Sequence, residues 1–425
     1  MIKALIVDNG GYTWLAELLG RLGVETGYYS PWENAFPLTR MVSLGSGLAG
    51  VERVNEPLRY LREDRPDLVI VPDLNHHDLE ALAREWGLPT FGSGEAARLE
   101  QDRLFLKEFL AKADLPVGEY EVIDGIDDLE EYLRNPKNRD KYLKVSTFRG
   151  DLNTFHHEDW EQTSDWLIRT RAQLGPLGNQ LRFLLEEPLE TELELSLEGI
   201  FIDGQLLEPF MVGMEIKDAG EAGWLCPSLN ALPPAVADVI RVIGAYFEEH
   251  EYRNFFAVEI RLMKDGTPFV TDVACRMPVP PGAALCHMID NLIEVLAQGA
   301  EGFVTVPEVG KLPVWFTEIE VKSRWRINNF LHVRYPAKVA EQVALFDHCL
   351  IDDERWCLPH MPLDPEMDAF GSVFSFGASL KAAAADCQET CEQIKALEIS
   401  WRHDVLDEAT EKLEKLADHG FEVEL

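Results

Sequence analysis

The sequence is poor in basic residues and has no long apolar run. Its 425 residues include 75 acidic but only 39 basic side chains, so the formal net charge is -36 at pH 7. Such a charge repels nucleic acid and anionic membranes, and we expect neither as a partner. No apolar run is long enough to span a bilayer, and the first residues, MIKALIVDNGG, are typical of a strand and turn rather than of a signal peptide. We therefore expect a cytoplasmic protein.

Cysteine is also scarce, and its spacing carries no ligand pattern. The seven cysteines form no C-x-x-C motif and no Cys/His spacing, which argues against a zinc site or a disulfide framework. The chain lacks a G-x-G-x-x-G motif at its first turn, where Asp8-Asn9-Gly10-Gly11 favours a plain tight turn and leaves a small-substrate pocket open. Hydrophobic residues at 46% are typical of a globular protein, and the length predicts about two to four domains.

The N-terminal quarter alternates strands with helices. Short apolar strands are expected at Lys3–Val7, Thr26–Tyr29 and Asp67–Pro72, and Trp14–Leu22 between the first two has helical spacing. This alternation predicts a parallel sheet.

Two strands near the middle of the chain carry carboxylates in apolar surroundings. Phe255–Lys264 and Thr267–Arg276 flank Asp265-Gly266, which is a strong hairpin signal. Glu259 interrupts the first strand and Asp272 the second. Carboxylates on neighbouring strands are costly to bury unless they are paired or bind a cation, so a shared divalent metal is one interpretation. A buried ion pair between Glu259 and Arg261 is the other.

Three further segments hold candidate residues or mobile parts. Lys144 lies on the strand Lys141–Val145, followed by the loop Ser146–Thr154, a combination suited to gripping phosphate. A helix is expected from Gly94 to about Ala113, with Lys107 as solvated charge. The Gly-rich segment Met214–Trp224 is expected to be mobile.

One predicted strand has a strongly acidic face. Glu192–Ile202 alternates strictly, with Glu194, Ser196 and Glu198 on the face opposite the leucines. Solvation of this face is the simplest interpretation.

Together these segments resemble the ATP-grasp superfamily of carboxylate–amine ligases, with a layout similar to the phosphoribosylamine–glycine ligase branch. The likeness spans most of the chain and includes the C-terminal segment FGSVFSFGASLKAAAADCQETCEQI. It implies an α/β and α+β fold with three parts. These are a Rossmann-like domain over residues 1–95, an ATP-grasp domain over 96–305 with a subdomain at about 115–190, and a small α+β domain over 306–425.

The resemblance also implies roles for individual residues. Glu259 and Asp272 correspond to the family's two acidic magnesium ligands. Arg276 corresponds to the arginine that holds the acyl phosphate or the substrate carboxylate, and Lys217 lies in a loop near the phosphates. Residues implied in nucleotide binding are Lys107, Lys144, Arg149, Gly150, Glu186, Glu187, Leu189 and Glu194. Ala274 replaces the Asn usual in the family's last motif, which removes one oxygen ligand and leaves open whether one or two ions bind.

The implied activity is an ATP- and Mg²⁺- (or Mn²⁺-) dependent ligase. It would join a small-molecule carboxylate to an amine or similar nucleophile through an acyl phosphate and release ADP. Two alternatives stay open: an ATP-binding homologue that has lost catalysis, and a small-molecule kinase that phosphorylates an acceptor without ligation. A homodimer is one expected assembly.

Overall fold

The computed structural model describes residues 2–31, 43–147, 154–310, 315–360 and 367–421, which divide into two compact units. The first unit comprises Met1–Ala96, Glu194–Glu259 and Ala274–Leu425, and the second comprises Ala97–Leu193 and Ile260–Val273. The predicted three-domain division at residues 95 and 305 stays a proposal. No helix in the described residues is long and apolar enough to cross a membrane.

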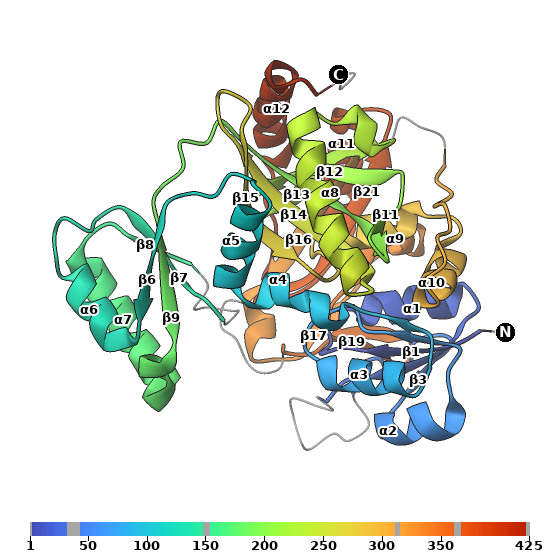
Figure 1. Ribbon diagram of the computed structural model, residues 1–425. Helices are drawn as coiled ribbons and strands as arrows, with labels where there is room; N and C mark the ends of the chain where they lie inside the picture. Colours follow the sequence, from blue (N-terminus) through green and yellow to red (C-terminus); the bar gives the residue numbers. More distant parts are fainter. Residues whose placement is uncertain (1, 32–42, 148–153, 311–314, 361–366, 422–425) are drawn as a thin grey trace. The chain divides into compact units, whose positions relative to one another are not determined.

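The first unit begins with a parallel sheet of order β3-β2-β1-β4-β5 (Figure 1). All its paired strands run parallel, as predicted from the alternation of strands and helices. Nearly continuous apolar runs such as KALIV suit a sheet covered on both faces. The strands are β1 (Lys3–Val7), β2 (Glu25–Tyr29), β3 (Val51–Arg53), β4 (Leu68–Ile70) and β5 (Thr90–Phe91).

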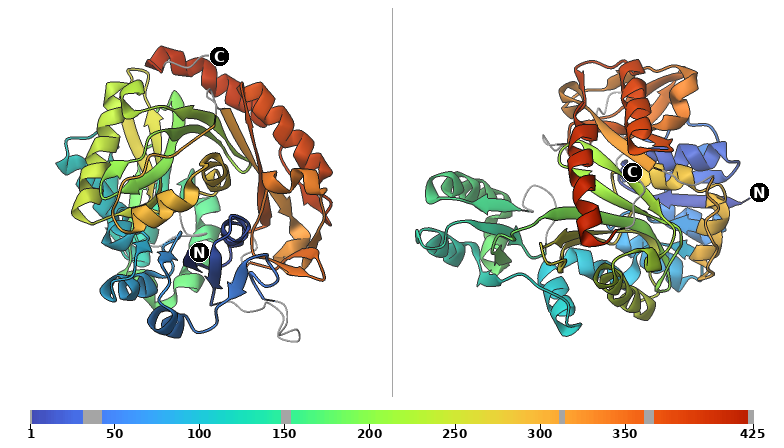
Figure 2. Two further views of the ribbon diagram at one scale, coloured as in Figure 1. Left: turned by 90° about the vertical axis from the view of Figure 1, so that its right-hand side faces the viewer. Right: turned by 90° about the horizontal axis from the view of Figure 1, so that it is seen from above.

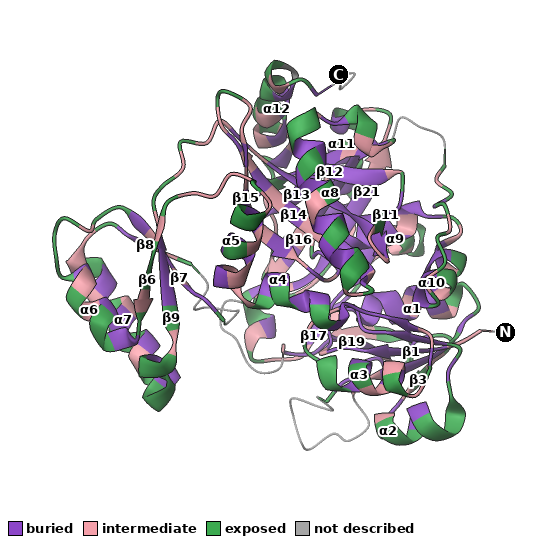
Figure 3. Cartoon of the chain, in the orientation of Figure 1, coloured by how far each residue is buried: buried purple, intermediate pink, exposed green. Residues whose placement is uncertain are grey.

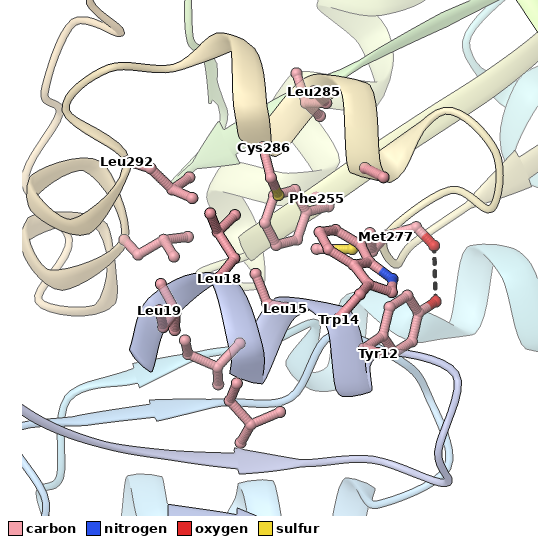
Figure 4. Packing of buried hydrophobic residues seen from close by; sticks show 14 of the residues in the cluster. Tyr12, Trp14, Leu15, Leu18, Leu19, Phe255, Met277, Leu285, Cys286 and Leu292 are labelled. Carbon is pink, nitrogen blue, oxygen red and sulfur yellow. Dashed lines mark hydrogen bonds between the residues drawn. The ribbon is translucent and has the colours of Figure 1, made fainter. Parts of the chain in front are cut away.

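The helix α1 (Thr13–Arg21) links this sheet to a later part of the first unit. Figure 4 shows Leu15 and Leu18 of α1 beside Phe255, with Trp14 near Met277. The Tyr12 hydroxyl, just before α1, donates to the Met277 carbonyl at 2.9 Å. Packing therefore places the turn after β1 next to the segment that follows β15. The other helices around this sheet are α2 (Pro57–Arg59), a π-helix (Tyr60–Asp64), α3 (His77–Glu85) and α10 (Leu292–Ala300).

A sheet of ten strands follows, in the order β15-β14-β10-β12-β13-β16-β21-β18, with β11 on β10 and β22 on β16. Its pairs from β10 to β18 are antiparallel. Its neighbours β14 and β15 confirm the predicted hairpin, and both strands run from one unit into the other. The strands are β10 (Leu193–Ile202), β11 (Gln205–Leu206), β12 (Phe210–Ile216), β13 (Gly220–Cys226), β14 (Arg253–Leu262), β15 (Pro268–Ala274), β16 (Trp315–Ser323), β18 (Val343–Leu345), β21 (Ala369–Gly377) and β22 (Ile399–Ser400).

Helices of the first unit pack on this sheet. α11 (Leu380–Gln393) contacts β16 and β21, and α12 (Val405–Leu416) contacts β12 and β13; both are at the red end of the chain in Figure 2. Figure 3 shows buried residues along the strands and exposed residues on the outer sides of the helices. Further elements of this unit are α8 (Pro234–Glu249), α9 (Gly282–Met288) and a three-stranded sheet of β17 (Leu331–Val333), β19 (His348–Ile351) and β20 (Glu354–Cys357).

The prediction that Met214–Trp224 is a mobile segment is wrong, because these residues form most of the β12–β13 hairpin. Its glycines serve close packing between strands. A Cβ atom on Gly223 would lie 2.1 Å from the Val212 carbonyl oxygen on the paired strand. The turn itself holds Asp218 at φ 58°, a left-handed conformation that Asp tolerates.

The second unit has a four-stranded antiparallel sheet of order β6-β9-β7-β8, with α6 (Ile126–Leu133) and α7 (Trp160–Leu174) beside it. The strands are β6 (Tyr120–Asp124), β7 (Lys141–Val145), β8 (Phe155–His157) and β9 (Arg182–Glu186).

The helix predicted from Gly94 to Ala113 is interrupted. It breaks at Asp102 into α4 (Arg98–Gln101) and α5 (Arg103–Lys112). The Asp102 carboxylate accepts from the Phe105 amide at 3.1 Å and from the Ser146 hydroxyl at 3.0 Å. Asp is a favoured N-cap, so α5 starts anew there.

Candidate functional site

A cluster of charged side chains, each no more than 15% exposed, lies in the second unit. Lys107 Nζ on α5 and Lys144 Nζ on β7 each lie 2.8 Å from a carboxylate oxygen of Glu186 at the end of β9. Burial alone would raise the pKa of Glu186, but the two ammonium groups outweigh it and lower that pKa. Two lysines on one carboxylate leave a surplus positive charge in a desolvated place, which suits phosphate oxygens.

The prediction of solvated charge at Lys107 is wrong, because its side chain is only 9% exposed. α5 turns this residue inward with Leu106 and Leu110, so the lysine follows the helix's buried face. Next to the cluster, Lys141 pairs with Glu187, a predicted nucleotide-binding residue.

Other predicted nucleotide residues lie elsewhere or outside the described part. Leu189 is half-buried, and its carbonyl accepts from the Thr191 amide at 2.8 Å. Arg149 and Gly150 lie outside the described residues. Glu194 belongs to the first unit, half-buried at the start of β10. The nucleotide-binding roles of all these residues stay predictions.

A cavity of about 300 Å³ opens in the first unit along β10, β12 and β13. Six carboxylates line it, against a single guanidinium, that of Arg276, among the described lining residues. The acidic lining residues are Glu198, Glu215, Asp218, Glu221, Glu259 and Glu320. Its chemistry therefore favours a cation over an anion, except near Arg276.

Arg276 lies near the carboxyl edge of the N-terminal sheet. Its Nε is 3.9 Å from Oδ1 of Asp73, which follows β4. At the same edge, the Asn9 side-chain oxygen lies 2.9 Å from His76 Nε2. The glycine turn after β1 and the end of β4 therefore lie beside Arg276, the residue that the resemblance assigns to the acidic substrate. Open α/β sheets often bind their ligands at this edge.

Beside this edge, burial raises the pKa of Asp8 to about 7. Its carboxylate accepts from the Gly10 and Tyr12 amides at 2.5 and 2.8 Å and so holds the turn. We assign it a structural role.

Two buried carboxyl groups meet in the cavity wall. Glu198 on β10 is 2% exposed and Glu221 on β13 is 4% exposed. The Ser196 hydroxyl donates to Glu221, and burial raises the pKa of Glu198 to about 7 and that of Glu221 well above its usual range. The predicted solvation of this acidic strand face is therefore wrong at Glu198, which is buried.

The predicted metal ligands are both partly exposed carboxylates. Glu259 lines the cavity, whereas Asp272 belongs to the second unit, where its Oδ1 accepts from the Val273 amide at 2.9 Å. Within the described residues, no group of three or more His, Cys, Asp or Glu side chains could hold a metal. Mg²⁺ commonly takes one or two carboxylates and completes its shell with phosphate and water, so the carboxylate of Glu259 fits it; the shared site with Asp272 stays a prediction.

Lys217, predicted as catalytic, is exposed in the turn between β12 and β13 and is not part of the cavity lining. Its carbonyl accepts from Arg402 Nη1 at 2.9 Å. Its role stays a prediction. Sequence reasoning missed Glu221; the available signal was a single carboxylate in β13, whose other residues are all uncharged.

Comparisons with known proteins agree with this architecture. No protein-family model matches the chain. Its sequence is 26% identical over 327 residues to the phosphoribosylamine–glycine ligase of Escherichia coli O6:H1, covering 71% of this chain and 74% of the relative. The enzyme of the same name from Salmonella typhimurium is also 26% identical, over 328 residues, with the same coverage.

Two solved structures extend the likeness to the whole fold. The phosphoribosylamine–glycine ligase of Thermotoga maritima superposes with a TM-score of 0.70 at 16% identity, covering 95% of this chain and 100% of that one. A biotin carboxylase–ATP-analogue complex from Campylobacter jejuni gives 0.67 at 14% identity, covering 99% and 98%. The chain has the ATP-grasp fold. The predicted likeness to ATP-grasp ligases is thereby confirmed, with the relatives named as ligases.

Proposed function

We propose that this ATP-grasp chain is an ATP- and Mg²⁺-dependent ligase that joins a small-molecule carboxylate to an amine through an acyl phosphate, releasing ADP. The observation that carries the proposal is the Lys107–Glu186–Lys144 cluster, whose side chains are each no more than 15% exposed. On this fold it offers two ammonium groups where phosphate oxygens would replace part of the Glu186 contact. The similarity to named ligases adds support.

Three groups of residues would divide the tasks of binding phosphate, Mg²⁺ and the acidic substrate. Lys107 and Lys144 would bind and orient the nucleotide phosphates, since phosphoryl transfer depends mainly on alignment and charge neutralisation. Glu259 and Asp272 would hold Mg²⁺, which supplies charge neutralisation at phosphate oxygens when bound. Arg276, with five fixed donors, would hold the carboxylate of the acidic substrate. A homodimer stays a prediction.

The test is ADP release by the full chain with ATP and Mg²⁺ across a panel of carboxylic acids, each with and without amines. Release that requires both an acid and an amine supports the ligase. Release with an acceptor alone, unaffected by amine, favours the kinase alternative. ATP binding without ADP release for any pair favours the homologue that has lost catalysis.

A Lys144→Ala variant distinguishes ADP release by this chain from ADP release by a contaminating ATPase. The exposed Lys137 lies on the loop before β7 and provides the matched control. Activity that survives Lys144→Ala as well as Lys137→Ala would not arise from the proposed cluster.

A further inference from the structure

Glu198 and Glu221 come together because the strand between them has a glycine, without a side chain, at the point where they meet. In the sheet order, β12 separates β10 from β13, and its Gly213 pairs with Ser196 on one side and Gly223 on the other. A Cβ atom at Gly213 would lie 1.6 Å from Glu221 Oε1. The missing side chain lets the Glu221 carboxyl lie across β12 and reach Ser196 on β10.

One oxygen of this pair has nothing to bind. Glu198 Oε2 is buried and has no hydrogen-bond partner among the described residues. Leaving a buried carboxyl oxygen unsatisfied costs free energy, and native structures rarely keep one without a ligand or a special role. Glu198 is also a lining residue of the 300 Å³ cavity.

The rest of the cavity lining agrees with a positively charged ligand. Glu215 and Asp218 are exposed lining residues and add negative charge. Glu320 already pairs with Lys322 at 3.2 Å, and Arg276 lies beside Asp73. Glu259 is not counted here, because the proposed function assigns it to Mg²⁺. The carboxyl groups left for a ligand are therefore the exposed Glu215 and Asp218 and the buried pair Glu198 and Glu221.

We propose that this cavity binds the amine substrate as an ammonium ion, with Glu198 Oε2 as an acceptor. The inference rests on the proposed ligase function and specifies its second substrate. The class is a small aliphatic amine without a carboxylate of its own, and a diamine fits best, because a second ammonium group meets the remaining acidic residues. An ammonium group brings three donors and no acceptor, so it satisfies buried carboxyl oxygens directly. An amino acid would bring its carboxylate into the same negative field.

The choice of an amine over a metal ion comes from the arrangement of the acids. Across the described residues, no set of three or more acidic, His or Cys side chains converges as metal ligands do. The cavity volume suits a small organic molecule at the lower limit of ligand pockets.

The proposal is tested by calorimetric titration of the full chain without ATP, using ethylenediamine and 1,4-diaminobutane as probes and glycine, sodium acetate and MgCl₂ as comparisons. We expect saturable diamine binding, weaker binding of glycine and none of acetate. Glu198→Gln keeps the shape but removes the charge, and should weaken diamine binding about tenfold or more. Glu294→Gln, at an exposed position on α10, should leave it unchanged.

Glu215→Gln covers the case in which Glu198→Gln fails to fold, because Glu215 is exposed and its replacement removes one lining charge. It should weaken diamine binding severalfold. Absence of saturable diamine binding would overturn the proposal, as would equal affinity in the folded Glu198→Gln protein. MgCl₂ binding that depends on Glu198 and blocks the diamine would also overturn it, and would make the cavity a metal site.

The ligase function and the amine site can be refuted independently of each other. If ADP release depends on an acid and an amine but no diamine binds in this cavity, the ligase stands and the amine site is wrong. If diamines bind through Glu198 but no acid and amine pair releases ADP, the cation site stands and the ligase is wrong.

Discussion

Glu318 provides a sharp test of how this fold accommodates buried acids. It lies on β16, is 1% exposed, and its Oε2 accepts from the Ala284 amide at the start of α9 at 2.8 Å. Its Oε1 lies 2.5 Å from the Ser372 hydroxyl. Burial is the largest influence and raises the pKa of Glu318 from 4.5 to about 7. The perturbation is Glu318→Gln, which keeps one acceptor and one donor but cannot ionise.

The magnitude follows from linkage between protonation and folding. The folded chain holds this proton more tightly than the unfolded chain, so the contribution to stability is complete below pH 4.5 and is lost as the pH rises through 7. A carboxyl pKa raised from 4.5 to about 7 corresponds to a loss of about 3 kcal/mol. Of this, about 2 kcal/mol falls between pH 5.5 and 8. Glu318→Gln should therefore gain about 2 kcal/mol over wild type across that interval.

The assay is urea unfolding of the full chain, followed by tryptophan fluorescence at pH 5.5, 6.5, 7.2 and 8. This interval stays above the sequence pI of about 4.6, where the protein would lack net charge. Glu320→Gln is the matched control on the same strand, because Glu320 is only half-buried and pairs with Lys322. A stability difference between Glu318→Gln and wild type that is the same at pH 5.5 and pH 8 would refute the reasoning.

Three further predictions concern the site. Lys144→Ala should raise the Kd for ATP about tenfold or more in equilibrium dialysis, since a charge-assisted contact is lost, with Lys137→Ala unchanged. Asp272→Ala should abolish metal-dependent turnover; ADP release that keeps its Mg²⁺ dependence in this variant would mean that the metal assignment is wrong. Gly213→Ala should lower the free energy of unfolding by about 1–3 kcal/mol and weaken diamine binding, because the new methyl group displaces Glu221. Gly310→Ala, where a Cβ atom meets nothing within 4 Å, should do neither.

Local signals in the sequence predicted much of the fold. The Asp-Gly turn fixed the β14–β15 hairpin, and alternation of strands and helices predicted the parallel sheet. The Lys107–Glu186–Lys144 cluster was partly predictable, because Lys144 interrupts an apolar strand and Glu186 ends another. The burial of Lys107 could not be predicted from local spacing, because α5 starts anew at the Asp102 cap, which depends on Ser146, 44 residues away.

The acidic cavity was less predictable for a physical reason. Whether Glu198 faces solvent or core depends on which strand lies beside β10, and that register is set by long-range pairing. Glycine content suggested mobility in Met214–Trp224, whereas Gly220 and Gly223 in this segment instead allow close packing against the neighbouring strands. Residue propensity alone cannot distinguish a mobile loop from closely packed strands, because glycine is common in both.

Oxygen transfer tests the central claim most directly. With an acid and amine pair that turns over, the acid would carry ¹⁸O in both carboxylate oxygens, and the released phosphate would be analysed by mass spectrometry. In an acyl-phosphate route the carboxylate oxygen attacks the γ-phosphorus and leaves with the phosphate when the amine forms the new C–N bond. The account predicts one ¹⁸O atom in each phosphate released, whereas phosphate without label alongside the ligated product would contradict it.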